Sequence, residues 1–202
     1  MADKFTLKDD AKSQFSPHPE GQFPAVCVDF IDLGEKVEQF EDNPAKLVYK
    51  VALVWQTGEA NEAGRLHEVS AEFTASMGDR ANLRKVLEDW RGKSYSKDEL
   101  KAGIPADKLV GRACLLTVEH KDSRAGRTYA KVRGIAPLPK GLAKPEVPEY
   151  TRPEFWAERK REYAEGAAKF RKATTHAAVV ADHDSDWENV PPAVETDDGL
   201  PF

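Results

Sequence analysis

Cationic and aromatic side chains gather between residues 121 and 133. Cations can neutralise phosphates and a flat ring can stack on a base, so this set is suited to bind single-stranded nucleic acid. Its alternation places the aromatic ring and two cations on one face of a strand, with Ala130 and Val132 facing a core. A solvated, charged edge strand is the alternative interpretation. The set consists of Lys121, Arg124, Arg127, Tyr129, Lys131 and Arg133.

Three further cations are candidates for the same groove. Lys46 and Lys50 share one face of the alternating stretch 46–56, and Arg65 follows a glycine-containing loop. Tyr49 and Trp55 lie on the other face of that stretch. The pattern leaves open whether these two aromatics are buried in a core or line a binding surface.

The elements that must position these residues follow from hydrophobic periodicity. Strands are predicted at 25–33, 46–56, 66–75, 112–120 and 127–135. Between the third and fourth strands, Asp79 is expected to cap a helix that Gly92 ends, and Ser96 begins a second helix with a capping box. This order is typical of a mainly β, five-stranded OB-type barrel with a helix between strands 3 and 4. Other small α+β domains share the order, so it does not by itself decide the fold.

The chain divides into four predicted segments. Residues 1–20 are expected to be a flexible N-terminal segment, and 21–140 to be the OB-type domain. Residues 141–173 form a linker and a basic helix in which Trp156, Tyr163 and Phe170 recur every seven residues. We interpret this stripe as docking on the barrel or on a second subunit, in preference to direct base stacking, so a homodimer is possible. Residues 174–202 are predicted to be a disordered acidic tail.

The charge distribution separates this tail from the rest of the chain. The net charge is −5, but seven acidic residues and no Lys or Arg lie between Ala181 and Phe202. Removing these seven from the chain's 35 acidic residues leaves 28, against 30 Lys and Arg. Such segregation is typical of an acidic interaction tail on a body with another role.

The last six residues, Asp-Asp-Gly-Leu-Pro-Phe, resemble the C-terminal tip of bacterial and phage single-stranded-DNA-binding proteins. The body, over about residues 22–140, more generally resembles phage-encoded proteins of this class with an OB fold, through stretches such as 28–34, 54–56, 82–92 and 108–111. The resemblance implies single-stranded DNA as ligand, in replication, recombination or repair, and protein partners that bind the tip. A terminal aromatic ring with preceding acids would enter an apolar pocket with a basic rim. The expected partner-binding residues are Asp197, Asp198, Leu200, Pro201 and Phe202.

Other functions stay open from the sequence. A metal-dependent nuclease could use carboxylates such as Asp29 and Asp32, but no phosphate loop or nucleophile motif accompanies them. A strand-annealing protein or recombination mediator would share the ligand, and a pure protein adaptor would not bind DNA. We expect no enzyme activity, cofactor or metal. Cys27 and Cys114 are expected in the core of a cytoplasmic protein that has no membrane association.

Overall fold

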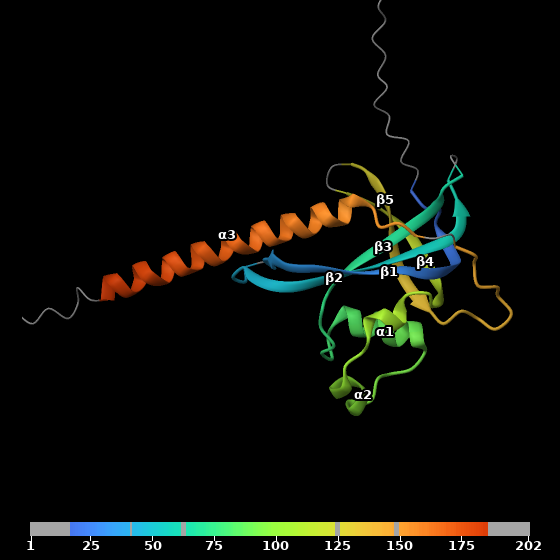
Figure 1. Cartoon of the computed structure of the whole chain (residues 1–202), viewed down its shortest axis with the longest axis horizontal. Coiled ribbons are helices and arrows are strands. Elements are labelled where there is room, and N and C mark those ends of the chain that lie inside the picture. Colours follow the sequence, from blue (N-terminus) through green and yellow to red (C-terminus); the bar gives the residue numbers. More distant parts are fainter. Residues whose placement is uncertain (1–16, 41, 62–63, 124–125, 148–149, 186–202) are drawn as a thin grey trace, which may run out of the picture.

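The computed structural model describes residues 17–40, 42–61, 64–123, 126–147 and 150–185, with the backbone alone for 176–185. Its centre is one five-stranded antiparallel sheet with the strand order β3-β2-β1-β4-β5 (Figure 1). This confirms the mainly β prediction and its five strands. β3 and β5 are the two edges, and the described residues form no hydrogen-bonded ladder between them. The strands are β1 (Gly21–Glu38), β2 (Lys46–Ala60), β3 (Leu66–Thr74), β4 (Ala113–Asp122) and β5 (Thr128–Ala136).

One face of the sheet carries the main core. Alternating residues of β2, among them Leu53 and Trp55, are fully buried there. The helix α1 (Asn82–Arg91) lies between β3 and β4 in the chain, as predicted, and covers this face with Leu87 and Trp90. Trp90 packs edge-on against Trp55 and donates its indole N–H to the carbonyl of Ala113 at 3.0 Å. A buried indole thus keeps a hydrogen-bond partner while it closes the core.

Both cysteines lie in this core, which confirms that prediction. Cys27 and Cys114 are fully buried and unpaired. Burial in apolar surroundings raises the pKa of the Cys27 thiol to about 12 and also raises that of Cys114. Both groups are therefore neutral thiols that pack as small apolar side chains.

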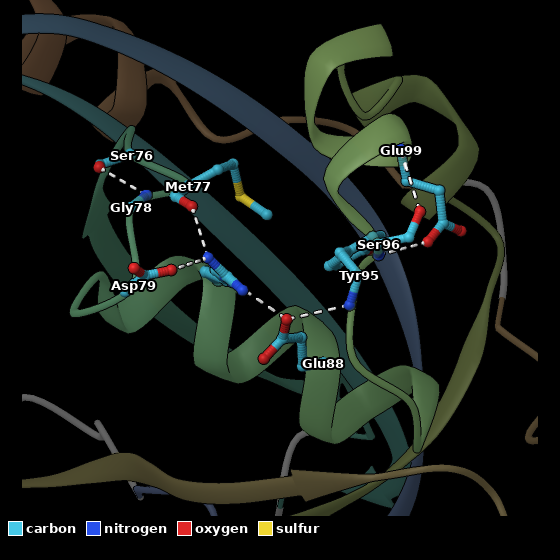
Figure 2. A network of polar contacts seen from close by, with 9 residues as sticks. Ser76, Met77, Gly78, Asp79, Glu88, Tyr95, Ser96 and Glu99 are labelled. Atoms are coloured by element: carbon cyan, nitrogen blue, oxygen red, sulfur yellow. Dashed lines mark hydrogen bonds and ion pairs between the residues drawn. The ribbon is translucent and has the colours of Figure 1, made fainter.

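The start of α1 differs from its prediction. The N-cap is Ala81, which has no capping side chain, and Asp79 instead accepts a hydrogen bond from Arg84 at 2.5 Å. Arg84 also donates to the backbone oxygen of Met77 and to Glu88, so it ties the preceding loop to the helix; Figure 2 labels these two partners and Asp79. The expected cap was wrong because Asp79 lies too far before the first turn.

The other helix signals between β3 and β4 are confirmed. Gly92 ends α1 in the left-handed region, with a φ of 69°. Ser96 caps the short helix α2 (Lys97–Ala102): its hydroxyl accepts from the Glu99 backbone N–H, and the Glu99 carboxylate accepts from the Ser96 backbone N–H, which completes the predicted capping box (Figure 2). A single 3-10 turn, η1 (Ala106–Leu109), then leads into β4.

The C-terminal helix α3 (Glu154–Ser185) covers the opposite face of the sheet and extends beyond it (Figure 1). Trp156 and Tyr163 are buried against a second apolar cluster that includes Ile31 and Val54. The predicted docking stripe is therefore confirmed for these two residues, and it docks on the chain's own sheet. Phe170, the third member, is only half-buried.

The helix α3 is also longer than predicted. It continues through residues 174–185, which the sequence analysis assigned to the acidic tail. The run of alanines within it favours helix, and the acidic composition concealed this preference. Residues 186–202, including all five predicted partner-binding residues, lie outside the described residues.

The end of the N-terminal segment is fixed to the sheet. His18 is 2% exposed, and its ring lies 2.7 Å from the hydroxyl oxygen of Thr57 in β2. Its burial lowers the pKa of the imidazole, so this ring is neutral at pH 7. His18, near the end of the predicted N-terminal segment, thus packs on the sheet, and residues 1–16 lie outside the described residues.

Candidate nucleic-acid interface

A cavity of about 1140 Å³ lies between the two edge strands β3 and β5. α1 contributes to one side of it and the first turn of α3 to another. Four of the nine predicted DNA-binding residues line it, although they come from segments more than sixty residues apart. These four are Arg65, Tyr129, Lys131 and Arg133.

The alternation of β5 sets the direction of Tyr129 and Lys131, and a bulge sets that of Arg133. Ala130 and Val132 pack against the main core, as predicted, which leaves Tyr129 and Lys131 on the open side. Tyr129 is 42% exposed. A register shift in the β4–β5 ladder pairs Thr117 with Gly134 and Val118 with Val132, so Arg133 is the bulged residue. Such a bulge redirects a side chain at a sheet edge.

The other cations of the hairpin lie beside the cavity and do not line it. Lys121 pairs with Tyr129 across the β4–β5 ladder and lies 3.6 Å from Glu119. Arg127 is exposed, and its backbone N–H donates to Ser123 within the turn. Arg124 lies outside the described residues.

The cations of β2 do not join this site. Lys50 is 8% exposed, and its ammonium lies 2.7 Å from Glu38 and 3.2 Å from the hydroxyl oxygen of Thr74. A phosphate could contact Lys50 only after this pair had been broken, so the structure argues against it as a groove residue. Lys46 is exposed beside Glu38 in the β1–β2 hairpin, and it does not line the cavity.

The two aromatics whose role the sequence left open have separate environments. Trp55 is fully buried in the main core. Tyr49 is 48% exposed in the β1–β2 hairpin, opposite Glu35, and does not line the cavity. The face of β2 that they share is therefore buried in the core at Trp55 and exposed at Tyr49.

Among the lining residues that the sequence analysis did not propose as DNA-binding, three could contact a nucleic acid through a ring or a positive charge. Phe155 and Arg159 come from the start of α3, and Lys85 comes from α1. Phe155 is 48% exposed, although its neighbour Trp156 is 5% exposed. An aromatic residue outside the seven-residue stripe was the available signal for Phe155, but no local pattern shows that α3 begins beside β5.

Acidic side chains in the cavity are partly neutralised by internal partners. Glu72 lies 2.8 Å from Arg159 and accepts the hydroxyl of Tyr163 at 2.6 Å. Burial and this hydrogen bond raise the pKa of Tyr163, which keeps its proton on the donor. Glu68 accepts a hydrogen bond from Gln56. The described lining then has five cations, Arg65, Lys85, Lys131, Arg133 and Arg159, against three acids, Glu68, Glu72 and Asp89.

The two carboxylates considered for metal binding hold α3 in place. Arg152 donates two hydrogen bonds of 2.7 Å to Asp29, a bidentate pair. Asp32 lies 3.1 Å from Lys160. Both acids therefore have a cationic partner from the C-terminal segment. Over the part of the chain that the structure describes, no group of three or more His, Cys, Asp or Glu side chains could hold a metal.

Comparison with known protein families and with curated protein sequences finds no match to this chain in either set. Among the described residues, no helix is long and apolar enough to cross a membrane.

Proposed function

We propose that this chain binds single-stranded DNA without strong sequence preference and recruits replication or repair proteins through its acidic C-terminus. The observation that carries the first half is the cavity between β3 and β5, where the exposed ring of Tyr129 lies among cations from three elements. Rings that stack on bases and cations that track the backbone are the two requirements of such binding.

We propose further that the sheet is an OB-type barrel. The strand order supports this, because β1 lies between β2 and β4 while β3 and β5 form the two edges. Those edges line one cavity, and α1 lies between β3 and β4 in the chain. In OB folds, strands 2 and 3 and the hairpin between strands 4 and 5 are usual contacts for oligonucleotides. In this chain, α3 covers part of the β1–β2 face, which directs DNA to the β3–β5 side.

The experiment that tests the proposed site is a titration of fluorescent oligo-dT with the wild-type chain and with Tyr129→Ala. We expect Tyr129→Ala to lose about 1–3 kcal/mol of binding free energy, because one base loses its stacking partner. The free energy of unfolding should barely change, since the ring is 42% exposed. Normal affinity in Tyr129→Ala would place the bases elsewhere, and a collapse of stability would make Tyr129 a core residue.

The acidic C-terminus is proposed to act separately from the DNA groove. Its acids have the same sign as phosphate, so they are suited to basic protein rims and not to DNA. Leu200 and Phe202 would then supply the apolar contacts of a partner's pocket.

This assignment predicts opposite effects for two activities. Deleting residues 186–202 should leave oligo-dT affinity equal or slightly higher, most visibly at low salt, where screening is weak. Phe202→Ala in the full chain should abolish pull-down of replication or repair proteins while DNA binding survives. A deletion variant that lost DNA and kept its partners would contradict the assignment. The matched control is Phe40→Ala, an exposed phenylalanine outside the tail.

A further inference from the structure

We infer that the start of α3 lines one side of the DNA groove and contacts the DNA. In this inference Phe155 is a second aromatic ring, besides Tyr129, on which a base stacks. This inference rests on the proposed function and extends it to residues outside the barrel. The helix would then have two roles: Trp156 and Tyr163 pack against the sheet, and Phe155 contacts the DNA.

The exposure of Phe155 distinguishes it from the docking face of α3. Trp156 is 5% exposed and Tyr163 is 6% exposed, so the docking face of α3 is well defined. Phe155 is 48% exposed and lines the cavity between β3 and β5. Packing of α3 on the sheet therefore does not require a phenylalanine at this position. A large apolar ring at the edge of a charged cavity is, however, what a base needs.

Two neighbouring side chains hold the Phe155 ring in place. It makes an edge-to-face contact with Trp156, with ring centroids 5.1 Å apart, and the Arg159 guanidinium lies 4.8 Å from its centroid. Trp156 is itself fixed in the second apolar cluster. A ring with a fixed position loses little conformational entropy when a base stacks on it.

Arg159 mainly holds the Phe155 ring in position, because its positive charge is already paired with an internal carboxylate. Its guanidinium is already 2.8 Å from Glu72, and Glu72 also accepts the hydroxyl of Tyr163. These contacts place a planar, ion-paired cation over one face of the Phe155 ring. We therefore expect Phe155 in α3 to contribute to DNA affinity by stacking on a base. Lys131 and Arg133 in β5 should contribute by binding phosphates.

The two contributions, stacking and charge, can be separated by measuring affinity and its salt dependence. Oligo-dT anisotropy is measured over a range of salt concentrations with the full chain. Phe155→Ala should weaken binding about 5- to 150-fold, as expected for one lost stacking contact. The slope of log K against log salt should not change, because no phosphate contact is removed. Phe155→Trp should retain the affinity, since it keeps a ring. Phe40→Ala, which removes a phenylalanine that is 59% exposed and lines another cavity, should bind normally.

The outcomes separate the inference from the proposed function. If Phe155→Ala binds as tightly as wild type while Tyr129→Ala is weakened, α3 only packs against the sheet and the inference is overturned. If Phe155→Ala weakens binding but also flattens the salt slope, α3 acts through charge, which again overturns it. If the wild-type chain itself does not bind oligo-dT, the proposed function fails first.

Discussion

Replacing Arg65, Lys131 and Arg133 together by alanine should weaken binding to oligo-dT and remove much of its salt dependence. Each phosphate contact on a single strand contributes about 0.7 to the slope of log K against log salt, so three lost contacts should flatten it by about 2. Over a tenfold rise in salt, the triple variant should then lose about 100-fold less affinity than wild type. Fluorescence anisotropy at several salt concentrations measures both quantities.

A charge-matched control distinguishes local contacts from the change in net charge. Lys46, Lys97 and Lys101 are exposed and do not line the cavity, so their triple alanine variant has the same net charge as the groove variant. We expect it to keep nearly the whole slope. Equal slopes in the two triple variants would show that the cavity between β3 and β5 is not where phosphates bind.

Trp156→Ala should lower the free energy of unfolding by about 3–5 kcal/mol, the range for removing a buried aromatic side chain. The indole is 5% exposed and packs in the cluster that joins α3 to β1 and β2. Its loss leaves a cavity and loosens the ion pairs beside it, including Arg152 with Asp29. Urea unfolding followed by circular dichroism measures the change.

The adjacent residue provides the control for this prediction. Phe155→Ala removes a ring of similar chemistry one position away, but that ring is 48% exposed, so it should change the free energy of unfolding little. If Trp156→Ala unfolds at the wild-type urea concentration, α3 does not dock on the sheet in solution. That result would also remove the side of the groove to which Phe155 belongs.

The parts of the fold that local patterns determine could be predicted from the sequence. Alternation along β5 correctly placed Ala130 and Val132 on the core side, because side chains of a strand alternate between its two faces. The capping box at Ser96 and the stop at Gly92 involve residues within one turn, so their spacing was enough. The burial of Trp156 and Tyr163 in α3 followed from their seven-residue spacing.

The parts that depend on contacts distant in sequence could not be predicted. Lys50 is removed from the site by its ion pair with Glu38, although the β1–β2 ladder places Gly34, and not Glu38, opposite Lys50. Phe155 joins the cavity because α3 packs across the sheet from a chain position more than eighty residues after β3. Neither relation leaves a local periodic signal. Arg65 was predicted to bind DNA because it follows a glycine-containing loop. That it lines the same cavity as β5 follows from the fold of the whole sheet.

The most direct test of the central claim is a comparison of oligo-dT with a duplex of the same length, titrated into the full chain at one moderate salt concentration. We expect tight binding of the single strand and much weaker binding of the duplex, because paired bases cannot stack on Tyr129. Competition by single strands of other sequence should be similar to that by oligo-dT. Equal affinity for single strand and duplex, or no binding of either, would contradict the account.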